Sequence, residues 1–373
     1  MPWHRVLAGL REVDRVRVAV VGTGFARQAH LPGYAMVDGV ELAAVCDNRP
    51  GRARQVAEEF GADRSCEDFA DVLSMADVDV VDICTPPTLH APMAVGALSA
   101  GKAVICEKPM SSDLESASRM AATAAGSELP TAIHFQSRYV AYNRFLRKVI
   151  ADGYLGEIRL VLVTALGDYA LDPGLEPHYA TWASMAEAGG GFLSSAMAHS
   201  LDLAQYIFGR IEPDAVLKQN ALPRKPALAW DFIHDDPLSA DSPTAGLAEV
   251  TGDDTAVIQG RLAGGGAVVA AGSWAVRNGG GTRIAAYGSD GTITLDNSGR
   301  ISGARGTDQL APMPLPAAVK QALGAPRDVP ALFAALARDF MDALGGSESP
   351  ADGRPFATFD DGLAVQRIIA AGG

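Results

Sequence analysis

The chain has 373 residues, of which 48% are hydrophobic, and it carries a formal net charge of −13. Single cores stop growing at roughly 250–300 residues, so a chain of this length is expected to form two domains. The acidic balance argues against nucleic acid or an anionic membrane as a partner, because both attract a basic face. The beginning of the chain has no long apolar stretch, so we expect no signal peptide, no spanning helix and a cytoplasmic protein.

Four cysteines stand at positions 46, 66, 84 and 106. They show no CxxC spacing, and three of them end apolar runs. We therefore expect reduced, mostly buried thiols, with neither disulfides nor a metal site.

The first element is an alternating apolar strand at 16–21 that leads directly into Gly22-Thr23-Gly24. This arrangement is typical of a dinucleotide-binding turn. Gly22 permits the tight turn, Gly24 lets a pyrophosphate approach the backbone, and a helix from near Phe25 directs its unpaired N–H groups at the phosphates.

The third glycine of the usual fingerprint is missing, because Arg27 occupies its position. Close packing of the helix on the strand must then rely on Ala26, or Arg27 turns outward toward the phosphates. Both interpretations remain open from the sequence.

A second strand, at 40–45, is followed by Asp47 and Asn48. Asp47 stands 25 residues after Gly22, near the roughly 20 expected for a carboxylate that binds the adenosine ribose diol. A carboxylate there repels a 2′-phosphate, which favours NAD over NADP, although Arg49 partly offsets the repulsion.

Two further strands end in polar residues that suit a cofactor site. An apolar run from 78 to 84 is broken by Thr85-Pro86, a helix follows from His90, and a short strand then ends at Glu107-Lys108. In open parallel sheets, ligands bind beyond the carboxyl ends of the strands, which is where these residues fall.

The pattern changes after residue 136, where the last strand of the first domain ends. A helix at 143–151 is followed by a long β pattern at 157–165, and later strands are separated by glycine-rich turns typical of an antiparallel meander. Those later strands are expected at 254–262, 267–274, 283–287 and 292–296. Residues 220–247 and 301–328 are expected to form long loops, and helices at 331–344 and 361–371 to pack back on the body.

Several pieces of the chain resemble the glucose-fructose oxidoreductase and inositol dehydrogenase (Gfo/Idh/MocA) family. They are the turn at Gly22, the segment from Thr85 to His90, the run GKAVICEKP ending at Pro109, the three glycines 189–191 followed by His199-x-x-Asp202, the YGSDGT turn at Tyr287 and the closing FDDGLAVQRIIAA. The resemblance covers nearly the whole chain. EKP in this context is its specific signature.

The resemblance implies an α/β fold: a Rossmann domain at 1–136 with a doubly wound parallel sheet, then an α+β domain at 137–373 with a large, open, mostly antiparallel sheet. That sheet implies a homodimer or homotetramer. The implied activity is NAD(P)-dependent hydride transfer at a secondary alcohol or ketone of a sugar, cyclitol or related polyol. The cofactor-binding set, in which Glu107 lies near the nicotinamide, is Gly22, Thr23, Gly24, Phe25, Ala26, Arg27, Asp47, Asn48, Thr85, Pro86, His90, Glu107 and Lys108.

Removing hydride from a carbinol requires a base for the hydroxyl proton and a donor or cation for the developing alkoxide. Lys108 and His199 suit these two roles. Asp202, one helical turn after His199, could orient the imidazole.

One departure from the family pattern bears on the substrate. The aspartate usually found four residues before the histidine is Ser195 here, and the usual glycine two before it is Met197. Ser195 can donate and accept a hydrogen bond but cannot act as a base. Further candidates for substrate contact are Gln136, Arg138, Tyr179, Trp182, Ser195 and Asp202.

Two other functions stay open. The first is an NAD-dependent glycosidase or lyase that oxidises a ring carbon transiently, and the second is a sensor that binds NAD without catalysis. The intact EKP run argues against the sensor, whereas Ser195 keeps it open.

Overall fold

The computed structural model describes residues 15–168, 182–228, 244–323, 327–346 and 356–372. The chain divides into two compact units. The first contains residues 1–136, 232–235 and 327–363, and the second contains 137–231, 236–326 and 364–373. Within the described residues, no helix is both long and apolar enough to cross a membrane.

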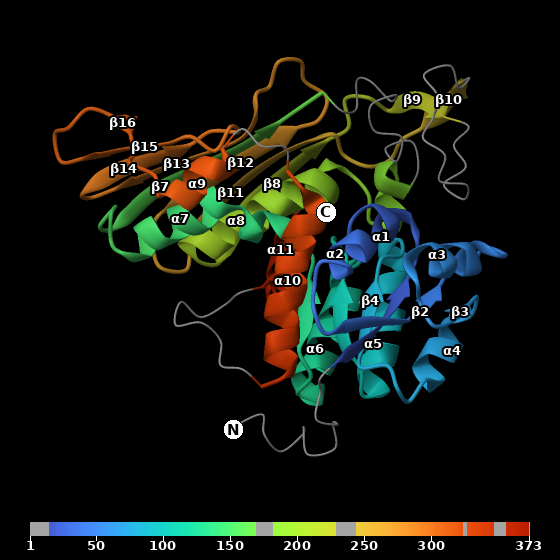
Figure 1. Ribbon diagram of the computed structural model, residues 1–373. Helices are drawn as coiled ribbons and strands as arrows, with labels where there is room; N and C mark the ends of the chain where they lie inside the picture. Colours follow the sequence, from blue (N-terminus) through green and yellow to red (C-terminus); the bar gives the residue numbers. More distant parts are fainter. Residues whose placement is uncertain (1–14, 169–181, 229–243, 324–326, 347–355, 373) are drawn as a thin grey trace. The chain divides into compact units, whose positions relative to one another are not determined.

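The first unit is built on a six-stranded sheet in the order β3-β2-β1-β4-β5-β6, with every neighbouring pair parallel (Figure 1). Its strands are β1 Val16–Val21, β2 Val40–Cys46, β3 Ser65–Cys66, β4 Val80–Ile83, β5 Ala103–Cys106 and β6 Thr131–Ile133. The strand order reverses between β1 and β4, the point at which such sheets bind ligands. The predicted Rossmann sheet is confirmed.

Short helices connect these strands, and three helices of this unit begin after an aspartate that caps them. Asp68, Asp113 and Asp328 each accept a hydrogen bond from a backbone N–H in the first turn of the helix that follows. The helices of this unit are α1 Gly24–Gln28, α2 His30–Tyr34, α3 Arg52–Phe60, α4 Phe69–Ser74, α5 Pro87–Ser99, α6 Leu114–Ser127 and α10 Val329–Leu344. Helix α11, Phe359–Ala370, begins in this unit.

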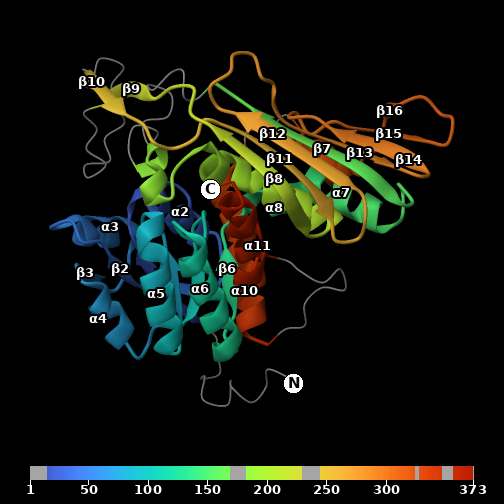
Figure 2. The same ribbon diagram turned by 180° about the vertical axis from the view of Figure 1, so that it is seen from behind.

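Helix α10 joins the first unit although it lies near the end of the chain. A Cβ at Gly33 of α2 would stand 2.7 Å from the Phe333 ring and 2.8 Å from the Pro330 carbonyl oxygen, so glycine allows the two helices to touch. Helix α10 therefore packs on the face of the sheet that carries α2, and Figure 2 shows α5 and α6 on the opposite face.

The second unit contains an eight-stranded sheet in the order β16-β15-β14-β13-β7-β12-β11-β8. Its strands are β7 Ile158–Leu166, β8 Ile211–Gln219, β11 Thr255–Leu262, β12 Ala267–Ser273, β13 Gly281–Gly288, β14 Gly291–Leu295, β15 Ile301–Arg305 and β16 Ala311–Pro312. Helices α7 Ala141–Ala151, α8 Ala198–Phe208 and α9 Ala317–Ala322 lie on one face (Figure 1).

The predicted meander is wrong in its order. Strand β7 lies between β12 and β13 and pairs with β12 in parallel, so the consecutive strands β12 and β13 are not neighbours. Period-two patterning marks strands but does not choose their partners. The sheet is otherwise antiparallel, as expected.

The two predicted long loops are also wrong in part. Residues 220–247 contain β9 Arg224–Leu228 and the start of β10 Thr244–Glu249, which pair as a two-stranded sheet, and 301–328 contain β15, β16 and α9. These short elements are rich in proline, alanine and glycine, so their sequences do not show a strand or helix pattern. Pairing with neighbouring segments stabilises them more than their intrinsic propensity does.

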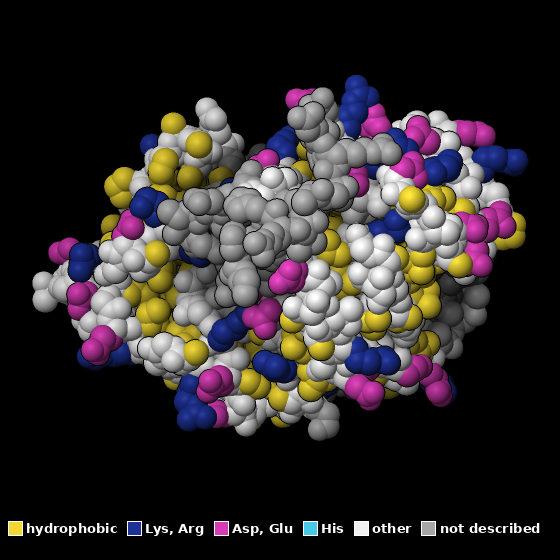
Figure 3. All heavy atoms as spheres, turned by 90° about the horizontal axis from the view of Figure 1, so that it is seen from below, with side chains coloured by type: hydrophobic (Ala, Val, Ile, Leu, Met, Phe, Trp, Pro, Cys, Tyr) yellow, Lys and Arg dark blue, Asp and Glu magenta, His cyan; other side chains and the backbone are white. Residues whose placement is uncertain are grey.

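Acidic and basic side chains are interspersed on the surface drawn in Figure 3, and the described residues show no large patch of one sign there.

Gly22 occupies the switch point between β1 and β4. Its φ is +86°, and a Cβ there would lie 2.7 Å from the Cys84 carbonyl oxygen. Gly24, two residues on, has no atom within 4 Å of its Cβ position.

We expect Gly22→Ala to lower the free energy of unfolding by about 1–3 kcal/mol, because it combines backbone strain with a steric clash. Gly24→Ala is the matched control and should cost clearly less. Urea unfolding of both variants measures the difference, and equal stability of the two would contradict the role given to Gly22.

Candidate functional site

The ends of β1 and β2 are joined by a buried polar cluster. Both the backbone N–H and the hydroxyl of Thr23 donate to Asp47 Oδ2, at 3.0 and 2.7 Å. Arg49 donates to Asp47 through Nε and Nη2, each at 2.7 Å, and Arg52 Nε donates to the Thr23 hydroxyl at 3.2 Å. Asp47 therefore lies where the sequence places it, with two arginines beside it.

This cluster holds Asp47 ionised. Burial raises its pKa, but Arg49 and Thr23 outweigh burial and lower the pKa to about 2. Both carboxylate oxygens already accept hydrogen bonds, so a ribose diol can reach the carboxylate only if Arg49 gives up part of its pairing. Asn48, the neighbouring candidate, is exposed.

The glycine turn has the features of a phosphate cradle. Gly24 is open at its Cβ position, and the first-turn N–H groups of α1 have no acceptor within the helix. Ala26 is fully buried, whereas Arg27 pairs with Glu59 at 2.8 Å. Ala26 therefore provides the close packing that the missing third glycine would give.

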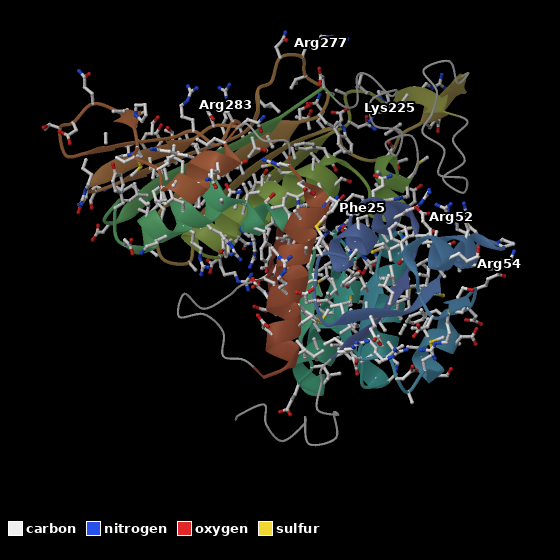
Figure 4. The ribbon with its side chains drawn as sticks, in the orientation of Figure 1. Phe25, Arg52, Arg54, Lys225, Arg277 and Arg283 are labelled. Atoms are coloured by element: carbon white, nitrogen blue, oxygen red, sulfur yellow. The ribbon has the colours of Figure 1, made fainter. Side chains whose placement is uncertain are left out.

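Figure 4 shows Phe25 and Arg52 along the same edge of the first unit. The Phe25 ring is 39% exposed, and its other side faces the buried rings of His30 and His134. An exposed aromatic ring directly after the glycine turn is a surface on which a cofactor ring can rest.

His90 ties together the loops that follow β4 and β5. Its Nε2 lies 2.7 Å from the Thr85 carbonyl oxygen and its Nδ1 3.0 Å from the Pro109 carbonyl oxygen. The ring is fully buried, and burial lowers its pKa. His90 thus holds Thr85-Pro86 near Lys108-Pro109, the latter joined by a cis peptide bond.

Glu107 and Lys108 follow β5, as predicted. Glu107 is buried, and its Oε2 accepts a hydrogen bond from the Lys108 backbone N–H at 3.0 Å. Burial raises the Glu107 pKa, but His134 and His30 outweigh burial and bring that pKa well below its ordinary value.

His30, Asp82 and His134 are functional candidates that the sequence analysis missed. All three are fully buried: His30 begins α2, Asp82 lies near the carboxyl end of β4, and His134 directly follows β6. For Asp82 and His134, the available signal in the sequence was a polar residue at the end of an otherwise apolar strand. His30, Glu107 and His134 place their ligand atoms within 4.8 Å of one another, as do His30, Asp82 and Cys84, so each group has the spacing of possible metal ligands, which the sequence did not suggest.

In the second unit, the helix predicted to carry His199 is present. It begins with a π-helical turn, Leu193–Met197, and continues as α8. Asp253 accepts a hydrogen bond from the Leu193 N–H at 2.8 Å at the start of this helix. Ser195 is buried within the π turn, and His199 is half-buried one turn later.

Arg138 and Asp202 form a buried ion pair. Arg138 Nε and Nη2 both donate to the Asp202 carboxylate, the former at 2.8 Å, and the guanidinium stacks 4.9 Å from the centroid of the Tyr206 ring. Arg138 is 2% exposed and Asp202 is fully buried, so the pair lies inside the protein. Both oxygens of Asp202 bind Arg138, which limits what Asp202 can offer to His199.

The remaining substrate candidates have varied surroundings. The Gln136 side-chain oxygen is buried and has no hydrogen-bond partner among the described residues, and Trp182 is half-buried in a short 3-10 turn. Tyr179 lies outside the described residues. Lys108 belongs to the first unit and His199 to the second, so each is placed here only within its own unit.

Lys225, in β9, is a further buried polar group that the sequence analysis missed (Figure 4). Its amine has no hydrogen-bond partner within the described part of the chain and lies 5.2 Å from the centroid of the Trp274 ring. Burial lowers its pKa against the pull of Asp254 and Asp253.

Family models identify the chain. Residues 16–135 match an oxidoreductase family with an NAD-binding Rossmann fold, and residues 143–294 match the Gfo/Idh/MocA C-terminal domain. The chain belongs to this family, and its first unit is an NAD-binding Rossmann domain. The resemblance noted in the sequence is confirmed.

Named relatives include sugar and cyclitol dehydrogenases. D-glucoside 3-dehydrogenase of Escherichia coli is 33% identical over 195 residues, which are 52% of this chain and 54% of that protein. Levoglucosan dehydrogenase of Pseudarthrobacter phenanthrenivorans is 28% identical over 57% of this chain and 56% of its own length, and inositol 2-dehydrogenase of Rhizobium meliloti is 28% identical over 54% and 57%. The matches span little more than half the length of these relatives.

Solved structures share the fold over nearly the whole chain. A levoglucosan dehydrogenase in complex with NADH has a TM-score of 0.80 at 22% identity and covers 96% of this chain and 97% of its own. An oxidoreductase domain protein from Kribbella flavida has a TM-score of 0.78 at 25% identity, with 96% of each chain covered.

The pairing of Arg49 with Asp47 makes a prediction about cofactor choice. The wild-type protein should bind NAD more tightly than NADP, because Asp47 stays ionised. Arg49→Met should widen this preference by about ten-fold, since a 2′-phosphate loses a charged hydrogen-bond donor while Asp47 keeps its charge.

Titration of both cofactors by calorimetry tests this, with exposed Arg54 replaced by Met as the matched control. NADP binding by the wild type that equals or exceeds NAD binding would contradict the role of Asp47. An Arg49→Met variant with unchanged NADP affinity would contradict the role of Arg49.

Proposed function

We propose that the protein is an NAD(H)-dependent dehydrogenase or reductase that transfers hydride at a secondary alcohol or ketone of a sugar, cyclitol or related polyol. The observation that carries this proposal is the EKP run after β5, where a buried, ionised Glu107 holds the backbone of Lys108 beside the switch point of an NAD-binding sheet. The names of the relatives support the substrate class.

Two residues of this chain suit the chemistry. NAD, held by the glycine turn and Asp47, would supply the acceptor for the hydride of the carbinol carbon. The Lys108 side chain, half-buried, donates a hydrogen bond to the reacting oxygen and stabilises its developing negative charge. His199, also half-buried, takes up the hydroxyl proton. Gln136, with its unsatisfied side-chain oxygen, offers an acceptor for a substrate hydroxyl.

We also propose a cytoplasmic homo-oligomer that associates through the second sheet. One face of β7 is buried beneath helices, whereas Leu160 and Leu162 on the other face remain partly exposed. Leu217 of β8 is 57% exposed and Tyr287 of β13 39% exposed. An open sheet with apolar side chains suits a second copy of itself.

Replacing Lys108 or His199 by Ala should lower turnover by roughly 10² to 10⁴ while leaving NAD binding nearly unchanged. A screen of sugars, inositols and their keto derivatives, followed by NADH absorbance, identifies the substrate and measures the rates. Lys148→Ala, which removes an exposed lysine paired with Asp152, should keep the wild-type rate.

A His199→Ala variant with full activity would show that the histidine is a packing residue. A wild-type protein that binds NAD but reduces none of it across the screen would contradict the dehydrogenase and favour the sensor. Turnover without added NAD and without NADH accumulation would favour the glycosidase or lyase.

Ser195 makes a separate prediction about specificity. It is buried, so a carboxylate there would be crowded or left unpaired, at a cost of about 1–3 kcal/mol. Ser195→Asp should therefore lower activity on the true substrate ten-fold or more, whereas Ser195→Ala should lower it less. Wild-type turnover of myo-inositol that improves in the Asp variant would show that Ser195 does not mark an altered specificity.

A further inference from the structure

Four buried ionisable side chains form a continuous chain beneath the cofactor-binding edge of the first unit. His30 stands at the start of α2, Asp82 in β4, Glu107 directly after β5 and His134 directly after β6. His30, Asp82 and His134 are fully buried, and Glu107 is 7% exposed. We call these four residues the His30 network.

His30 is the centre of this network. Its Nδ1 lies 2.8 Å from Asp82 Oδ2, and its Nε2 lies 3.0 Å from Glu107 Oε1. The second histidine, His134, places its Nδ1 2.5 Å from the same Glu107 oxygen. Two imidazole rings therefore converge on one carboxylate oxygen.

The hydrogen-bonding groups define where the protons are. Carboxylates only accept, so the state of His30 that satisfies both Asp82 at Nδ1 and Glu107 at Nε2 is the imidazolium, which carries a hydrogen on each ring nitrogen. Burial lowers the His30 pKa, but the Asp82 carboxylate outweighs burial and brings that pKa well above its ordinary value. The other titratable groups packed here, Tyr34 and Cys84, remain neutral because burial raises the pKa of both.

His134 has a different protonation state. It must donate from Nδ1 to Glu107, and burial lowers its pKa despite that carboxylate, so it is neutral and its Nε2 carries no hydrogen. That Nε2 is buried and has no hydrogen-bond partner among the described residues. The His30 network thus holds two carboxylates and one imidazolium.

The distances between His30, Glu107 and His134 fit hydrogen bonds better than they fit the ligands of a metal ion. The three facing atoms of His30, Glu107 and His134 are 3.0, 3.0 and 2.5 Å apart. Ligands of a tetrahedral zinc ion at about 2.0 Å stand about 3.3 Å from one another. All three separations are shorter than this zinc-ligand spacing, so the atoms are spaced as hydrogen-bond partners and not as ligands of one ion.

Glu107 connects the His30 network to Lys108, the proposed catalytic lysine. Glu107 Oε1 accepts from the two histidines, and its Oε2 accepts from the Lys108 backbone N–H at 3.0 Å. Phe333 of α10 stacks on His30, with ring centroids 3.9 Å apart and planes at 22°, and helps to exclude water from it. The carboxylate is therefore fixed at both oxygens.

We propose that His30 is a positioning residue, an imidazolium clamped between Asp82 and Glu107 that orients Glu107 and, through it, the peptide that carries Lys108. The inference rests on the proposed function for the role of Lys108, but the protonation states belong to the protein alone. His30 contacts neither the reacting atoms nor solvent.

The first test observes the protonation states in the full-length protein. Nitrogen-15 labelling of the seven histidines and an NMR titration from about pH 5 to 9 should show one ring that stays an imidazolium throughout. That signal should vanish in His30→Gln. Titration of every histidine near its ordinary pKa, or one equivalent of bound zinc in the purified protein, would overturn the proposal.

The second test separates positioning from packing. His30→Gln should lower kcat by roughly 10- to 100-fold, with the KM for NAD within about three-fold, because Lys108 is displaced and not removed. Phe340→Leu is the matched packing control, because this buried ring of α10 faces Phe356 and not the His30 network. It should lower the melting temperature yet keep kcat within about three-fold.

If His30→Gln does not fold, the double variant His30→Gln/Asp82→Asn removes both charges of the pair and serves in its place. Wild-type turnover with an equal kcat in the His30 variant overturns the positioning role alone. Absence of wild-type turnover, with the imidazolium present, overturns the proposed function alone.

Discussion

The structure of the first unit depends on the burial of two ionised carboxylates at the carboxyl ends of parallel strands. Asp47 ends β2 and Glu107 follows β5, and each would be costly to bury alone. Hydrogen bonds from Arg49 and Thr23 offset the cost of burying the Asp47 carboxylate, whereas hydrogen bonds from His30 and His134 offset that cost for Glu107. The glycine turn, the loop tied by His90 and α10 all surround these two carboxylates.

The two carboxylates have different consequences for function. The charge of Asp47 is balanced by Arg49, which is partly exposed and can move away when a ribose binds to the carboxylate. Glu107 is compensated by groups sealed inside the fold, with Phe333 stacked on His30. The cofactor-recognition end of the sheet is therefore adaptable, and the end that bears Lys108 is rigid, as hydride transfer at a defined distance requires.

Much of the first unit could be predicted from the sequence, because β1, β2 and β5 are short apolar runs that are followed directly by Gly22, Asp47 and Glu107. The glycine turn, Asp47, His90 and the EKP run lie where those patterns place them. The second sheet could be predicted in content but not in order. The parallel pairing of β7 with β12 joins segments about 100 residues apart, and no local pattern specifies that choice.

The candidate site was harder to predict from the sequence than the fold was. His30 stands eight residues after Gly22, the first glycine of the fingerprint, in a segment predicted to be a helix, and Asp82 lies inside an apolar strand. Neither residue was recognisable as part of a site until the structure placed β4, β5 and β6 side by side. Arg138 and Asp202 looked like separate substrate contacts, yet they form one buried pair whose partners are 64 residues apart. Residue types alone do not show whether such a residue contacts the substrate or forms a buried pair, because that depends on contacts between distant segments.

The central claim is direct hydride transfer from a polyol carbon to NAD. It is tested most directly by incubating the protein and NAD with perdeuterated sugars and perdeuterated inositol and weighing the NADH formed. We expect NADH that carries one deuterium, taken from the carbon that is oxidised. NADH without deuterium, or deuterated substrate converted with no NADH formed, would contradict the account.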